Sequence, residues 1–240
     1  MSSVNAFRLT VSERRARGRA ARSEVPRSAH ADWGPHPDRP EPVELLDEQA
    51  QTRVPELVPI RNGRMASSAF AFFRGAAYVM ASDLAATPRT GLNVQACGDA
   101  HLSNFGGFAA PDRHLVFDIN DFDETLPGVD FTVDLKRLTA SVAVAALAGG
   151  ASKKQARQTA HWAAQAYRIR MRALAKLTPL EVWHSKIDLM QEIQHIRFAF
   201  QMANGVINNG IINRPGPLLP GTPEFEAALV HGFKAVSGLP

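Results

Sequence analysis

The chain has 240 residues, of which 45% are hydrophobic, and a formal net charge of +4. This composition excludes a chain that is disordered throughout, and the length suffices for one large or two small domains with a buried core. The longest apolar run, residues 141–150, is far shorter than the ~20 residues that a membrane-spanning helix needs. Cys97 is the single cysteine, which excludes an intramolecular disulfide and fits a reducing compartment. The sequence therefore predicts a cytoplasmic protein that is not inserted in a membrane.

The first 43 residues predict a basic and proline-rich arm. Seven arginines lie between residues 8 and 27, against two glutamates, and residues 26–42 contain five prolines. Clustered arginines can attract phosphates or acidic surfaces. Basic N-terminal segments are more often solvated and frayed, however, so we do not expect nucleic-acid binding.

The following residues predict alternating helices and short strands, which we place in a domain at 44–188. A short helix starts at 44, and helical spacing within 64–86 begins after Ser67 or Ser68 as N-cap. Residues 92–98 predict a strand that runs into a turn at Gly98.

A β-hairpin is predicted next, closing at residues 111–113 between the apolar runs FGGFAA and HLVFDI. Further helices are expected from Asp130 or Thr132 to about Leu147, from Ser152 to about residue 177, and at residues 179–183. Beyond about residue 190 the chain becomes rich in glycine, asparagine and proline, so residues 189–240 form a separate, divergent C-terminal segment in this interpretation.

One short stretch, CGDAHLSNFGGF at residues 97–108, concentrates polar residues among glycines, and FDINDFDE follows it. Asp99 lies at the end of the predicted strand, with Asn104 after it and Asp118 and Asp121 further on. Carboxylate and amide oxygens are the ligands that Mg²⁺ prefers, especially when substrate phosphates complete its shell. A carboxylate that does not bind the metal can accept a proton from a hydroxyl nucleophile. The pattern thus indicates metal and phosphate chemistry, although Asp and Asn also favour such loops as ordinary turn residues.

The segments GDAHLSNFGGF, HLVFDINDFDE and DFTVDLKRL resemble the catalytic segment of aminoglycoside phosphotransferases and other small-molecule kinases of the protein-kinase-like fold. This resemblance implies Mg²⁺ and ATP as cofactors, Asp99 as catalytic base and His101 as the residue that organises the catalytic loop. It further implies that Asn104 is a metal ligand and Asp121 the principal metal ligand. Asp134 would be the acid that anchors the following helix and buttresses the loop. Asp121 is preferred over Asp118 because an aromatic residue follows it, although Asp118 lies at the more usual interval from Asn104.

A second resemblance covers more of the chain. PRSAHADW, RMASSAFAFFRGAA, CGDAHLSNFG, VFDINDFDET and DLKRL are similar, in order and spacing, to the bacterial domain of unknown function 2252 family over about residues 12–188. The family has no established activity. It implies a helix-rich α+β fold, a divergent kinase-like catalytic lobe with short β-hairpins. The glycine-rich and lysine-bearing strands that should hold the nucleotide are not found, and the chain departs from the family pattern near residue 190, so that lobe is missing or replaced.

The resulting expectation is a Mg²⁺-dependent phosphotransferase that acts on a small molecule, or a degenerate or incomplete descendant of such an enzyme, with a small-molecule or nucleotide ligand. One alternative is a non-catalytic binding or scaffold protein, with a protein partner that supplies the missing lobe; another is a metal-dependent hydrolase. Arg74 is the candidate for binding cofactor phosphate, because a guanidinium can bind two oxygens at once, but an ion pair with an acid would also explain it. Cys97 is expected to be a small buried residue, and Lys136 and Arg137 are expected on a solvated helix face.

Overall fold

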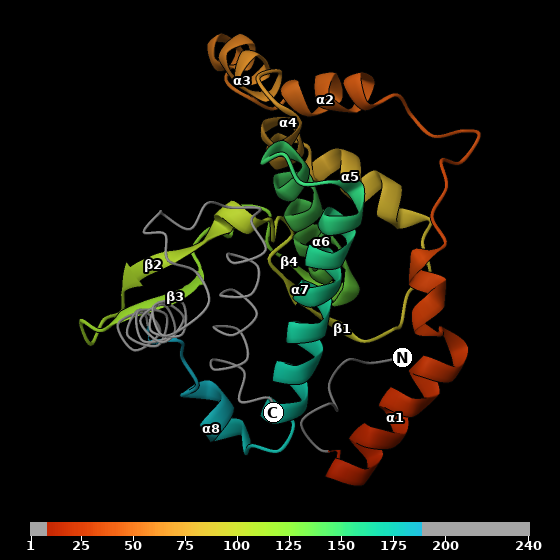
Figure 1. The fold of residues 1–240 in the computed structure, drawn as a ribbon, viewed down its shortest axis with the longest axis vertical. Coiled ribbons are helices and arrows are strands. Elements are labelled where there is room, and N and C mark those ends of the chain that lie inside the picture. Colours follow the sequence, from red (N-terminus) through yellow and green to blue (C-terminus); the bar gives the residue numbers. More distant parts are fainter. Residues whose placement is uncertain (1–8, 189–240) are drawn as a thin grey trace, which may run out of the picture. The chain divides into compact units, whose positions relative to one another are not determined.

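Residues 9–188 are described in the computed structural model shown in Figure 1, and they form a helix-rich α+β structure with short antiparallel strand pairs. This confirms the expected fold class at that level. The chain divides into two compact units. Unit 1 comprises the described residues up to Leu102 together with Asp121–Ala148, and unit 2 comprises Ser103–Asn120 together with the described residues from Gly149 onward. The predicted C-terminal segment at 189–240 lies outside the described residues, and the boundary expected after residue 43 stays a prediction.

Unit 1 contains six α-helices. They are α1 (Val11–Glu24), α2 (Pro42–Ala50), α3 (Val58–Met65), α4 (Ala69–Gly75), α5 (Ala77–Ala85) and α6 (Thr132–Ala148). Helix α1 begins with a capping box, in which Thr10 and Glu13 each bind the other's backbone N–H. Short 3₁₀ turns lie at Arg27–Ala31 and Pro55–Leu57.

The apolar core of unit 1 lies among its middle helices. Helix α2 packs on α5, α3 packs on α4, and both α4 and α5 pack on α6, as Figure 1 shows. The buried apolar cluster consists of Leu45, Leu46, Met65, Ala76 and Val79. Burial of these side chains joins α2, α3 and the start of α5, while α4 and α5 make the contacts with α6, the helix that carries much of the candidate site.

The helical spacing within residues 64–86 predicted one helix, but the structure has two after the N-cap. Ser68 is that cap, because its Oγ accepts the Ala71 N–H at 3.1 Å. The helix then breaks at Gly75–Ala76, where the Ala76 backbone leaves helical geometry. The Gly75 carbonyl accepts a hydrogen bond from Arg61 at 2.5 Å, and a Cβ on Gly75 would lie 2.5 Å from the Met65 Sδ. The expectation of a single helix was therefore wrong, and tertiary contacts explain the break.

The strands of unit 1 form an antiparallel pair, β1 (Asn93–Ala96) with β4 (Leu126–Asp130), whose register shifts between Val94 and Gln95. Strand β1 was expected and β4 was not. Pro127 and Gly128 interrupt the alternation by which a strand is recognised in a sequence. Asp130 ends β4, and its carboxylate accepts hydrogen bonds from Thr90 and Gly91 and from the start of α6.

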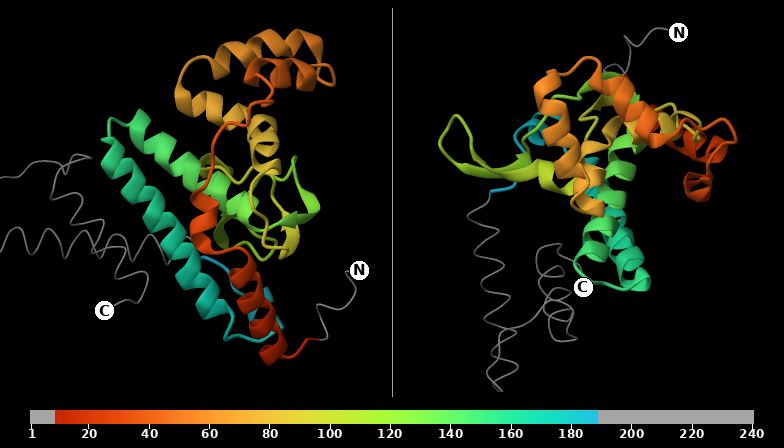
Figure 2. Two further views of the ribbon diagram at one scale, coloured as in Figure 1. Left: turned by 90° about the vertical axis from the view of Figure 1, so that its right-hand side faces the viewer. Right: turned by 90° about the horizontal axis from the view of Figure 1, so that it is seen from above.

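Unit 2 contains the predicted hairpin and two further helices. Strands β2 (Phe105–Ala109) and β3 (Leu115–Ile119) pair in antiparallel register, and Figure 2 shows them as a ribbon closed by a turn. Arg113 adopts a left-handed conformation in that turn, with φ of 66°. The helices are α7 (Lys153–Leu174), which Ser152 caps as expected, and α8 (Pro179–Trp183). Across residues 9–188, no helix combines the length and apolar character that crossing a membrane requires.

Candidate functional site

The site begins at the turn that follows strand β1. Asp134, in the first turn of α6, accepts the Cys97 N–H at 2.8 Å and the Gly98 N–H at 3.0 Å. Gly98 has a φ of 86°, and a Cβ on it would overlap the Glu124 carbonyl oxygen, so only glycine fits this turn. The expectation that Asp134 supports the loop is confirmed. The backbone that presents Asp99 is therefore rigidly held.

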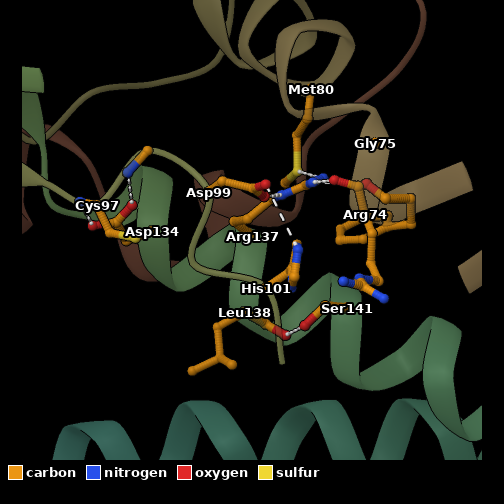
Figure 3. A network of polar contacts seen from close by, with 12 residues as sticks. Arg74, Gly75, Met80, Cys97, Asp99, His101, Asp134, Arg137, Leu138 and Ser141 are labelled. Atoms are coloured by element: carbon orange, nitrogen blue, oxygen red, sulfur yellow. Dashed lines mark hydrogen bonds and ion pairs between the residues drawn. The ribbon is translucent and has the colours of Figure 1, made fainter. Parts of the chain in front are cut away.

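Asp99 forms a buried ion pair with Arg137, as Figure 3 shows. The Arg137 Nε donates to the Asp99 Oδ1 at 2.7 Å, and the two residues are only 2% (Arg137) and 7% (Asp99) exposed. A buried charge is costly unless it is paired and hydrogen-bonded. Arg137 thus compensates the charge of Asp99 and fixes the direction of its carboxylate.

The same guanidinium also binds the end of α4. Its NH2 group donates to the Phe73 carbonyl at 2.7 Å and to the Arg74 carbonyl at 3.4 Å, and it lies 4.0 Å from the centroid of the Phe73 ring. The expectation that Arg137 lies on a solvated helix face was wrong, because this ion pair and the carbonyl groups of α4 bury it. Lys136 is half-buried, and its Nζ donates to Thr87.

Arg137 is the important residue that the sequence interpretation missed. One signal could have found it: Arg137 follows Asp134 by three positions on a predicted helix, so both side chains project from the same face. Because Asp134 supports the loop, the helix face that carries Asp134 and Arg137 is directed toward the loop.

His101 lies beside the ion pair, with its Nε2 3.7 Å from the Asp99 Oδ2, and it is 3% exposed. Burial lowers the pKa of His101; the Asp99 charge opposes this effect, whereas Arg137 and Arg74 reinforce it. The next residue, Leu102, donates its N–H to the Oγ of the fully buried Ser141 at 2.9 Å. The loop is thus attached to α6, and the burial of His101 favours its neutral imidazole form.

Arg74 is brought to the same region by α4. Its side chain is exposed, and in Figure 3 it extends toward the side on which His101 lies. None of the hydrogen bonds or ion pairs found within residues 9–188 involves the Arg74 guanidinium. The alternative explanation of Arg74, an ion pair with an acid, is therefore not observed in that range.

The acids that follow the hairpin lie near the Gly98 turn. The Asp121 carbonyl accepts a hydrogen bond from the Cys97 Sγ at 3.3 Å, and its half-buried carboxylate accepts the Asp123 N–H. Glu124 is exposed as a whole residue, but its carboxyl group is partly shielded from solvent. This desolvation is the main cause that raises the Glu124 pKa, and repulsion from Asp99, Asp121 and Asp123 raises it further. Negative charge is thus concentrated at this turn. Cys97 is buried as expected, and burial raises the pKa of its thiol.

The other two predicted metal ligands belong to unit 2. Asn104 is buried at the start of β2, and its carbonyl accepts the Asn120 N–H at 3.0 Å. Asp118 is exposed on β3, opposite Gly106, and its Oδ1 accepts the N–H of the next residue at 2.8 Å. Asn104 and Asp118 remain predicted ligands, whereas Asp99, His101 and Arg74 come together within unit 1.

The chemistry of the donors in unit 1 suits a hard cation, because carboxylate oxygens surround the Gly98 turn. No group of three or more histidine, cysteine, aspartate or glutamate side chains is arranged to hold a metal ion in the described part of the chain. Mg²⁺ is usually bound by one or two carboxylates together with substrate phosphates, so such a group is not required. Mg²⁺ therefore stays a predicted cofactor, for which the carboxylates near the Gly98 turn are ligands of a suitable kind.

Comparisons with known proteins identify the family and nothing beyond it. The chain matches no curated protein and no solved structure. Residues 53–210 match the DUF2252 family, described as an uncharacterized protein conserved in bacteria. The match starts later than the expected residue 12 and continues past residue 190, where a departure from the family pattern was expected. Since it covers more than half of the 240 residues, the chain belongs to the DUF2252 family of uncharacterized proteins conserved in bacteria.

Proposed function

We propose that the protein is a Mg²⁺-dependent phosphotransferase that acts on a hydroxyl group of a small molecule. The observation that carries this proposal is the buried Asp99 carboxylate, which a rigid turn presents and which Arg137 holds through Oδ1. A carboxylate with a fixed direction can act as a general base if the acceptor hydroxyl lies within hydrogen-bond reach. The kinase-like order of Asp99, His101, Asn104 and Asp121 in the sequence supports the same assignment.

In this proposal Asp99 accepts the proton of the acceptor hydroxyl while the hydroxyl oxygen forms a bond to the γ-phosphorus of ATP, and ADP leaves. The proton would go to the Asp99 carboxylate, which Arg137 holds through Oδ1. Neutral His101 lies on the Oδ2 side and keeps the loop in place without adding a competing charge. Phosphoryl transfer requires mainly positioning and charge stabilisation, and both depend on a rigid site.

Asp121 would hold Mg²⁺ in unit 1; Asn104 and Asp118, which belong to unit 2, are ligands predicted from the sequence alone. Bound Mg²⁺ would neutralise negative charge on the transferred phosphoryl group. The raised pKa of Glu124, caused by desolvation and then by Asp99, Asp121 and Asp123, supports this assignment. A cation at the turn would relieve the repulsion among these carboxylates.

Isothermal titration of ATP, with and without Mg²⁺, tests the proposal. We expect binding that requires Mg²⁺ and is lost in Asp121→Ala but kept in Asp47→Ala, a matched change of an exposed acid on α2. Asp99→Asn should keep ATP binding and reduce transfer to an acceptor by a factor on the order of 100 or more. If the intact, folded chain does not bind ATP, the protein is not an autonomous phosphotransferase.

A second candidate function is a non-catalytic binding or scaffold protein, and the Asp99–Arg137 pair favours it. A carboxylate whose charge is already compensated by a buried arginine can serve the fold alone. In that case Asp99→Asn would change the free energy of unfolding but no turnover, and a protein partner would supply what the chain lacks. Screening acceptors with the wild type and Asp99→Asn in parallel separates the two functions.

A further inference from the structure

We propose that Arg74 forms an anion-binding subsite beside Asp99, which binds phosphate or carboxylate oxygens of the molecule that reacts there. The identity of that molecule rests on the proposed function, whereas the existence of the subsite does not. Arg74 has an anchored backbone, and its guanidinium has no hydrogen-bond or ion-pair partner among residues 9–188.

The backbone on both sides of Arg74 is held by tertiary contacts. Arg137 binds the Phe73 and Arg74 carbonyls, and Arg61 binds the Gly75 carbonyl at 2.5 Å. The Met65 side chain lies where a Cβ on Gly75 would be. The start of the Arg74 side chain is therefore fixed relative to Asp99, because the same Arg137 guanidinium binds both segments.

The side chain of Arg74, in contrast, is not tied to the rest of the described chain by a hydrogen bond or an ion pair. It is exposed, and its guanidinium takes part in no hydrogen bond or ion pair found within the described residues 9–188. It is close enough to His101 to act on that residue electrostatically, and Figure 3 shows both side chains on the same side of the ion pair. Among the described residues, the site thus presents a guanidinium without an ion-pair partner close to His101, which itself lies beside Asp99.

A guanidinium is suited to anions with two oxygens, because its planar N–H groups match phosphate and carboxylate in a bidentate arrangement. Those oxygens can come from the phosphates of a nucleotide or from an anionic group on the acceptor. The chemistry is the same in both cases, so separate probes are needed to identify the source.

Isothermal titration measures the affinity of the protein for ATP in the presence of Mg²⁺ and for glycerol phosphate in the absence of nucleotide. Glycerol, which lacks the phosphate, is the neutral reference. Arg74→Gln should bind one of the two anions about tenfold more weakly than the wild type. Arg74→Lys keeps the charge but loses the planar fork, so its affinity should be intermediate. Arg64→Gln is the matched control, since it removes another exposed arginine, on α3. All three variants should unfold at the wild-type urea midpoint.

If Arg74→Gln weakens the binding of ATP alone, the subsite binds nucleotide phosphates. If it weakens the binding of glycerol phosphate alone, the subsite binds the acceptor. The proposal is overturned if Arg74→Gln binds both anions as Arg64→Gln does, or if the wild type binds neither. ATP binding that depends on Asp121 but not on Arg74 would overturn the subsite and retain the phosphotransferase. Binding of glycerol phosphate that depends on Arg74, in a chain that does not bind ATP, would retain the subsite and overturn the autonomous phosphotransferase.

Discussion

Replacing Arg137 by methionine is the most informative perturbation of unit 1. Methionine approximates the length of arginine and fits an apolar environment, but it provides neither the charge nor the donors. Asp99, 7% exposed, would then remain buried without its cation, and the Phe73 carbonyl would lose its donor at 2.7 Å. We therefore expect a large loss of stability and a displaced Asp99 carboxylate.

The magnitude follows from the geometry of the pair. Breaking a buried ion pair by removing one partner costs about 3–5 kcal/mol, because the other charge stays buried. Native domains are stable by only about 5–15 kcal/mol, so this is a considerable fraction of the total. The double variant Asp99→Asn/Arg137→Met removes the unpaired charge and should regain about 2 kcal/mol relative to Arg137→Met.

Urea unfolding followed by circular dichroism measures these free energies, with Arg64→Met as the control at an exposed arginine. A second measurement follows the His101 imidazole by NMR. Because Arg137 contributes to the lowered pKa of His101, the pKa should rise in Arg137→Met. If Arg137→Met unfolds within about 0.5 kcal/mol of the wild type, as ordinary surface substitutions do, and the His101 pKa is unchanged, the assignment of Arg137 as the residue that holds Asp99 is wrong.

Three further predictions concern the surroundings of the site. Asp134→Ala leaves the Cys97 and Gly98 N–H groups without their acceptor, and it should cost about 2–4 kcal/mol in urea unfolding. Gly98→Ala combines a left-handed φ with an overlap on the Glu124 carbonyl, so it should cost more than about 2 kcal/mol; an unchanged thermal midpoint would contradict this reading. Burial alone would raise the pKa of Asp130, but hydrogen bonds from Thr132 and Thr90 outweigh it and lower that pKa. This stabilisation is present above the unfolded pKa of about 4 and is lost as the pH falls through the folded pKa. Asp130→Asn should therefore be less stable at pH 7 and show a flatter pH dependence below pH 4.

Most elements with a local signal were predictable from the sequence. Capping residues and glycine or proline stops locate α6, α7 and α8, and two apolar runs around a turn locate the β2–β3 hairpin. Strand β4 was not predictable, since Pro127 and Gly128 mask its pattern and its pairing with β1 spans the hairpin. The break at Gly75 was also hidden, because it depends on contacts with Met65 and Arg61 and not on the local spacing.

The candidate site was predictable as a list of chemical groups but not as an arrangement. Asp99 and Arg74 were singled out by their chemistry and position and His101 by the resemblance to kinases, and the structure places the three together in unit 1. Arg137 was overlooked because a Lys-Arg pair on a helix is typical of a solvated face. Arg137 is buried against Asp99, which lies 38 positions earlier in the chain, and a local sequence pattern does not predict such a contact.

The way the chain leaves and re-enters unit 1 has a consequence for the hairpin between. Unit 1 ends at Leu102 and resumes at Asp121, and contacts within unit 1 already join the two sides: Cys97 Sγ donates to the Asp121 carbonyl, and Thr125 Oγ1 donates to the Ala96 carbonyl at 2.6 Å. The entropy lost on closing a loop grows only with the logarithm of its length, about 0.6 kcal/mol for each doubling. The turn of the hairpin, between Ala109 and Leu115, can thus lengthen or shorten at little entropic cost while Asp99 keeps its support.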